Sequence, residues 1–200
     1  MNITDLLQGN LPDGLLDTIS KQLGGADTNQ TQVAAHSALS AITSAIARNA
    51  ATPTGATSLV SALDRDHDGS ILDDLAGFLS GNRQPANTAM LNGSGILNHV
   101  LGNNQSNVVD MITKMSGMDK SKAGSLLAML APLVMGALGK ARNQQGLGVG
   151  DLTNLLRNTV QTEAQQNQHA SLINRFLDQD GDGSIMDDLA SFGMKFLSRR

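Results

Sequence analysis

The chain has 200 residues, of which 40% are hydrophobic and 2% aromatic, with a formal net charge of −4 and no Cys, Trp or Tyr. The lack of Cys excludes disulfides, thiolate metal sites and a Cys nucleophile. Abundant Ala, Leu and Met with few aromatic residues favour helices over strands. The acidic balance and the scarcity of aromatic rings disfavour nucleic acid as a partner.

The first residues, MNITDLLQGNLPDG, have neither a basic region nor a long apolar run, so they do not resemble a secretory signal. We therefore expect a cytoplasmic protein, and extracellular or cell-surface export by a non-standard route stays open. After them, Leu15, Leu16, Ile19 and Leu23 have helical spacing and are followed by the stop signal Gly24-Gly25. The sequence predicts a short helix here.

A longer helix is predicted next. Val33, Leu39, Ile42 and Ile46 fall on one apolar stripe, and small Ala and Ser residues lie beside it. Small side chains let neighbouring helices approach closely. This stripe is expected to face the core.

An acidic segment, DRDHDGSILDDL, covers residues 64–75. Asp64, Asp66 and Asp68 stand at positions one, three and five of this segment, Gly69 at six and Ser70 at seven. Three carboxylates that face one point repel one another, and a hard divalent cation relieves that repulsion. The pattern resembles the calcium loop of EF-hand and dockerin-type proteins, in which a Gly permits a sharp turn and the apolar eighth residue points into the core.

The second part of the chain repeats features of the first. The stretch LDTISKQLGG (16–25) is similar to VDMITKMSGM (109–118), and SAITSAIAR (40–48) is similar to PLVMGALGK (132–140). We expect an all-α protein of two related helical halves. The first half spans residues 1–84 with a calcium loop at 64–74, and the second spans 85–200 with a calcium loop at 178–188.

The run AGSLLAMLAPLVMGALG (123–139) contains no charged residue. It is shorter than a usual membrane span and carries Pro132 in its middle. We interpret it as a buried core helix and expect no stable membrane insertion.

A second acidic segment, DQDGDGSIMDDL (178–189), repeats the first with Asp178, Asp180, Asp182, Gly183 and Ser184. Both segments depart from an EF-hand, because position twelve is a Leu instead of a bidentate Glu. Acids stand at positions ten and eleven instead, and either could close the loop if the next helix began at the Ser in an N-cap role. A helix-capping turn without metal is the alternative. The predicted ligands are Asp64, Asp66, Asp68, Ser70, Asp73 and Asp74 in the first segment, and Asp178, Asp180, Asp182, Ser184, Asp187 and Asp188 in the second. His67, at position four, is expected to point to solvent and to take no part.

LLAMLAPLVMGALGK (126–140), LDTISKQLGG and DRDHDGSILDDLAGFL together resemble the YidB-like bacterial family, known as domain of unknown function 937. The resemblance covers most of both halves. It implies an all-helical domain and no catalytic residues.

These observations favour a calcium-binding, non-enzymatic protein that takes two Ca²⁺ per chain, with the metal organising the fold or the assembly of a homo-oligomer. The alternative is a structural, self-assembling filament or shell protein in which calcium is a staple. A metal-dependent enzyme is a weaker third hypothesis.

Overall fold

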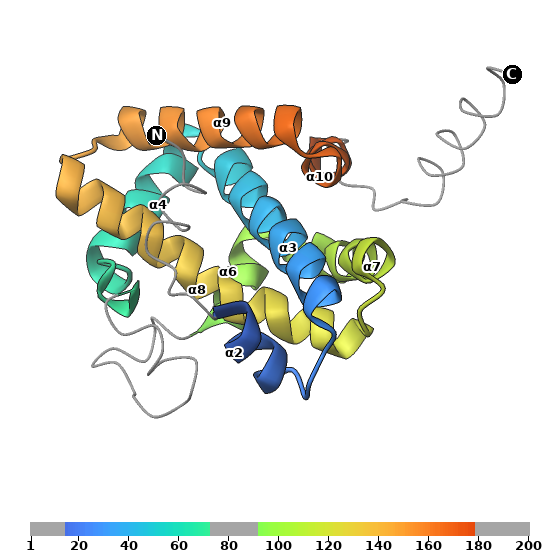
Figure 1. Cartoon of the computed structure of the whole chain (residues 1–200). Helices are drawn as coiled ribbons and strands as arrows, with labels where there is room; N and C mark the ends of the chain where they lie inside the picture. The colour runs from blue at the N-terminus through green and yellow to red at the C-terminus, as the bar shows by residue number, and fades with distance from the viewer. Residues whose placement is uncertain (1–14, 73–91, 179–200) are drawn as a thin grey trace, which may run out of the picture.

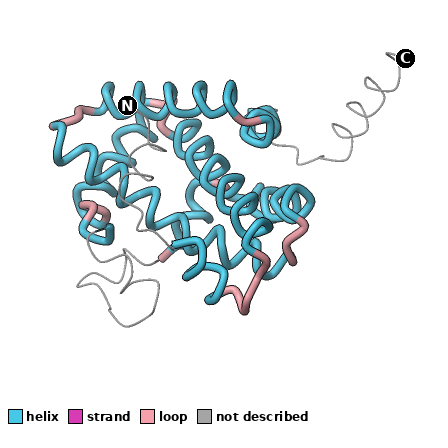
Figure 2. Tube along the Cα trace, in the orientation of Figure 1, coloured by secondary structure: helices cyan, strands magenta, loops and turns pink. Residues whose placement is uncertain are grey.

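The computed structural model describes residues 15–72 and 92–178, and throughout these ranges the regular structure is helical (Figure 2). The prediction of an all-α fold is confirmed for this part of the chain. The helices, in chain order, are α2 (Leu15–Gln22), α3 (Thr28–Asn49), α4 (Pro53–Asp66), the 3₁₀ turn η1 (Ser70–Leu72), α6 (Gly93–Val100), the 3₁₀ turn η3 (Gly102–Asn104), α7 (Gln105–Ser116), α8 (Lys120–Gln145), α9 (Val149–Gln166) and α10 (Gln168–Asp178).

Two long helices, α3 and α8, cross in the middle of the molecule, and the others pack around them (Figure 1). The most buried face of α3 is made largely of alanines, since Ala34, Ala38 and Ala41 have no exposed surface, together with Ile42 and Ile46. The predicted apolar stripe is therefore only partly right: its isoleucines are buried, whereas Val33 and Leu39 are half-buried. Small residues form the central contact because they let two helices approach closely.

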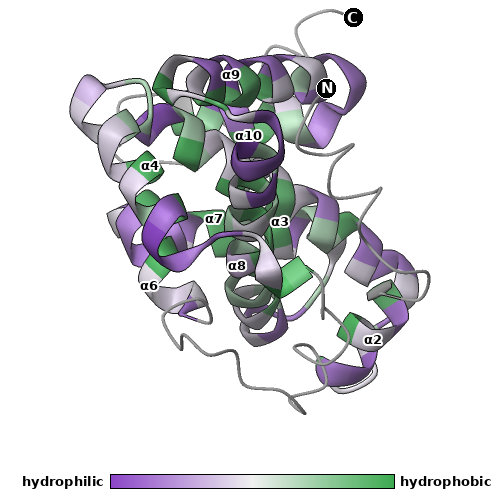
Figure 3. Ribbon diagram, turned by 90° about the vertical axis from the view of Figure 1, so that its left-hand side faces the viewer, coloured by the Kyte–Doolittle hydropathy of each residue, from purple (hydrophilic) through white to green (hydrophobic). Residues whose placement is uncertain are grey.

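The apolar run is a core helix, as predicted. Among the described residues, α8 is a helix long and apolar enough to cross a membrane, but 72% of its most apolar stretch is buried inside the fold. A helix that is apolar around its whole circumference needs partners on every side, and α3, α4, α6, α7 and η1 supply them. Hydrophobic residues gather around this crossing, and hydrophilic ones lie on the outer faces of α2 and α10 (Figure 3).

Each central helix begins in the same way. Gly24 and Gly117, which align in the sequence repeat, both have positive φ, at 73° and 70°. An Asp cap follows each: the Asp27 carboxylate accepts from the Gln30 N–H at 3.0 Å, and that of Asp119 accepts from the Ser121 N–H at 2.8 Å. These local signals stop α2 and α7 and start α3 and α8.

The α9–α10 pair lies across one end of α3 (Figure 1). Leu152, Leu156 and Ile173 are buried there. Polar contacts fix the placement: the Ser40 hydroxyl donates to a Glu163 carboxylate oxygen at 2.9 Å, and the Ser44 hydroxyl donates to the Asn174 side-chain oxygen. The packing of α10 on α3 therefore fixes the position of the end of α10, which is the end of the described part of the chain.

Candidate functional site

The first acidic segment begins inside a helix. Helix α4 starts with the Thr52 hydroxyl accepting from the Gly55 N–H at 3.1 Å and with Pro53 in its first turn. It continues to Asp66, so Asp64 and Asp66 lie in its last turn. Negative side chains are unfavourable at this end of a helix, by about 0.3–1 kcal/mol each, because the helix dipole is negative there. Cationic groups are expected to compensate them.

Arg142 of α8 provides this compensation for Asp64. Its Nε and Nη2 donate to the two carboxylate oxygens of Asp64 at 2.8 and 2.7 Å, which is a bidentate ion pair. These hydrogen bonds lower the pKa of Asp64, so its carboxylate is charged at neutral pH. The same guanidinium donates to the Leu147 carbonyl oxygen at 2.5 Å and thereby binds the end of α8.

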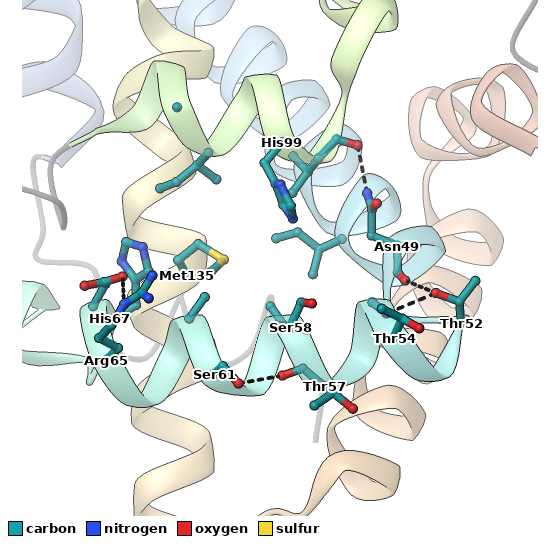
Figure 4. Close-up of a pocket in the computed structure, with 18 of the residues that line it drawn as sticks. Asn49, Thr52, Thr54, Thr57, Ser58, Ser61, Arg65, His67, His99 and Met135 are labelled. Atoms are coloured by element: carbon teal, nitrogen blue, oxygen red, sulfur yellow. Dashed lines mark hydrogen bonds and ion pairs between the residues drawn. The ribbon is translucent and has the colours of Figure 1, made fainter.

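Asp66 points elsewhere. Residues two apart on a helix do not share a face, and the Asp66 carboxylate accepts from Arg65 Nε at 2.8 Å (Figure 4). Within residues 15–72 and 92–178, no group of three or more His, Asp or Glu side chains is gathered closely enough to hold a metal ion. Asp73, Asp74 and the predicted ligands of the second segment after Asp178 lie outside the described residues, and Asp178 is the last residue of α10.

The middle of the segment forms a tight turn. Gly69 has a φ of +97°, in the left-handed region that favours glycine. The Asp68 carboxylate accepts from the Ser70 N–H at 2.9 Å, and this bond lowers the pKa of Asp68. Ser70 is the first residue of η1, and Asp68 is its partner. Ile71, the eighth residue, is buried as predicted.

The expected orientation of His67 is wrong. It was expected to point to solvent, yet it is only 5% exposed, and its Nδ1 is buried without a hydrogen-bond partner. Burial lowers the pKa of His67, against the opposing charges of Asp66 and Asp68, so the imidazole is neutral at pH 7. The reason for the error is that the segment lies directly on α8 instead of projecting from the surface.

Two glycines of α8 make this contact possible. A Cβ atom at Gly139 would lie 1.7 Å from the His67 carbonyl oxygen, and one at Gly136 would lie 2.4 Å from a methyl carbon of Ile71. The Asn143 side chain adds a hydrogen bond to the Asp68 carbonyl oxygen at 2.9 Å. Sequence analysis missed this docking surface, although two glycines three positions apart in an otherwise apolar helix were a signal for close approach.

Comparison with known proteins gives one result. A family model described as "Bacterial protein of unknown function (DUF937)" matches residues 5–141. This range includes the first acidic segment and ends before the second. Neither the curated proteins nor the solved structures gave a match. Because the matched range is more than half of the chain, the protein belongs to the DUF937 family of bacterial proteins of unknown function.

Proposed function

We propose that this protein is a calcium-binding, non-enzymatic module, built of two related helical halves, in which the ion organises the ends of α4 and α10 and the assembly of the chain. The supporting observation is the turn at Gly69. Its left-handed φ lies between Asp68 and Ser70, directly after a helix end that carries Asp64 and Asp66. This is the turn that an EF-hand-like loop requires at its sixth position.

The chemistry of the donors suits a hard cation. The pKa values of Asp64 and Asp68 are both lowered, so these carboxylates are charged well below neutral pH. Calcium takes six to eight oxygen ligands and tolerates varied geometry, whereas magnesium requires a stricter octahedron. The ligands in the first segment would be Asp64, Asp66, Asp68, Ser70 and either Asp73 or Asp74.

Arg142 holds Asp64 in the described arrangement, so calcium and the guanidinium compete for this carboxylate. The last turn of α4 also keeps Asp64 and Asp66 on different faces. Calcium binding therefore includes release of Asp64 from Arg142 and opening of that turn. Together with the missing Glu at position twelve, this makes a moderate affinity the expectation, on the order of micromolar to millimolar.

The test is a calorimetric titration of the full chain with Ca²⁺ and, separately, with Mg²⁺. We expect two calcium sites, with one lost in Asp64→Ala and the other in Asp178→Ala. Adding chelator should increase hydrogen exchange after the first acidic segment, at residues 70–80. A titration without heat or ion uptake would refute the proposal.

Two bound calcium ions would bring the formal net charge of −4 to zero. A net charge near zero promotes association because long-range repulsion is lost. We therefore expect calcium to shift the protein toward a homo-oligomer. Light scattering in millimolar calcium tests this point separately, and a monomer mass at high protein concentration would leave a calcium-stabilised module without assembly.

A further inference from the structure

A groove of about 1160 Å³ runs along the whole length of α4, between α4 and α6 (Figure 4). Its apolar lining comes from four helices, and hydroxyl groups such as those of Thr54 and Ser58 line its α4 side. The apolar residues are Ile46, Pro53, Leu59, Ala62, Ile96, Val100 and Met135. Several of them pack on the core while remaining only partly buried. An apolar floor with a polar wall suits an amphipathic helix.

The groove begins where the described chain ends. A smaller hollow of about 270 Å³ shares Asn49, Thr52 and Val100 with the groove and is also lined by Arg48 and Leu177. Leu177 is the penultimate residue of α10. The chain that follows α10 therefore starts at one mouth of the groove, at the end where α4 begins.

The following residues, 179–200, lie outside the described part, but their sequence has the pattern that this groove suits. Ile185, Leu189, Phe192 and Phe196 are spaced by four, three and four residues, which places them on one face of a helix. A helix over residues 184–198 would be about 22 Å long, and α4, which forms one wall, is about 21 Å long. The residues after Leu177 can span up to about 26 Å before Ile185, enough to enter the groove.

The charges at the two ends of the groove favour one direction of the segment. Arg48 lies at the near mouth, where the acidic residues that follow α10 would arrive first. Arg65 and Asp66 line the far end as an ion pair, and the exposed Asp68 follows them in the chain. In the segment, Lys195 and Arg199 come last. A helix running parallel to α4 would therefore place its acidic start near Arg48 and its basic end near Asp68.

We propose that residues 184–198 of the same chain pack in this groove as an amphipathic helix parallel to α4, with Phe192 and Phe196 on its apolar floor. The groove is then an intramolecular docking site for the C-terminal segment. This inference does not depend on calcium, because the groove, the apolar stripe and the path from Leu177 are present without the ion.

The test uses the full chain, which has no Cys, so introduced thiols can be spin-labelled selectively. One label is placed at Ser94→Cys, which is exposed at the start of α6 near the far end of the groove, and the other at Ser198→Cys. Electron–electron distance measurements are made in chelator, with the doubly labelled chain diluted in excess unlabelled protein. We expect a narrow population at short distance.

Two variants test whether the groove causes this population. Ser58→Arg fills the groove at an exposed serine, and Ser121→Arg makes the same change at an exposed position of α8 that does not line it. The short-distance population should be lost in Ser58→Arg and in Phe192→Asp, and retained in Ser121→Arg, with unchanged circular dichroism in all three. Retention in Ser58→Arg would contradict docking in this groove.

The occupant is identified by mixing two singly labelled chains. The proposal requires that this mixture shows no short distance. A broad distribution in the diluted, doubly labelled chain would overturn the proposal, and so would a short distance that appears only in the mixture, because a second copy would then fill the groove.

Discussion

Gly139→Ala is the sharpest test of how the acidic segment sits on α8. The added methyl group would lie 1.7 Å from the His67 carbonyl oxygen and 2.8 Å from its carbonyl carbon. These are backbone atoms, so no rotation of a side chain relieves the clash. The segment must move away from the helix, or the helix must shift.

Two opposing effects set the change in the free energy of unfolding. Ala stabilises a helix interior by about 0.5–1 kcal/mol relative to Gly, and forced overpacking costs about 1–3 kcal/mol. Gly124 is the matched control, because it lies in the same helix and a Cβ there would meet nothing within 4 Å. Gly124→Ala should therefore raise the free energy of unfolding by up to about 1 kcal/mol. The free energy of unfolding of Gly139→Ala should be lower than that of Gly124→Ala by about 1–3 kcal/mol.

Chemical denaturation of the two full-length variants measures this difference, and thermal unfolding should show midpoints about 2–12 °C apart. The stability of Gly136→Ala is expected to lie between those of Gly124→Ala and Gly139→Ala, since its methyl group meets the Ile71 side chain, which can rotate. Equal stabilities of Gly139→Ala and Gly124→Ala would show that the segment does not rest on α8, and would refute the reasoning.

Further predictions concern charge. Burial lowers the pKa of His67, so below about pH 6.5, the ordinary pKa of His, the unfolded chain binds more protons than the folded one and the free energy of unfolding falls. His67→Leu should abolish this part of the pH dependence, whereas His36→Gln, at an exposed position, should not. Unfolding measured at pH 5.5 and 7.5 tests both variants. Arg142→Gln should raise calcium affinity by up to about fivefold, because it releases Asp64 from the bidentate ion pair. Arg157→Gln removes the same charge from an exposed position of α9 and should leave the affinity unchanged in the same titration.

The helices could be predicted from the sequence because their signals are local. Apolar spacing located α2 and the uncharged apolar run located α8, and Gly24 marked the end of α2, where it has a positive φ. The buried face of α3 was harder to find. Its centre is Ala34 and Ala38, and alanine gives no periodic hydrophobic signal strong enough to outweigh the larger Val33 and Leu39 nearby.

The acidic segment shows the limit of reasoning from spacing. The turn at Gly69 and the burial of Ile71 follow from local sequence, and both were predicted. The partner of Asp64 was not, because Arg142 lies 78 positions away and only the packing of α4 on α8 brings the two together. The burial of His67 has the same origin, because Gly139 of α8 provides the space for the segment and no residue within the segment indicates that space.

Calcium and the C-terminal segment would compete for the carboxylate of Asp68. Asp66 is already paired with Arg65, so an ion held by Asp68 neutralises the charge that is left to attract Lys195 and Arg199 at the far end of the groove. An exposed ion pair contributes about 0.2–1 kcal/mol, so its loss should weaken docking by up to about fivefold without abolishing the apolar contact. Because such coupling is reciprocal, Phe192→Asp, which releases the segment, should raise calcium affinity at the first site by a similar factor. The spin-label distances, repeated with and without calcium, measure one side of this linkage and calorimetry measures the other. If calcium leaves the short-distance population unchanged while both calcium sites fill, then Asp68 does not attract the segment, and apolar packing alone holds it.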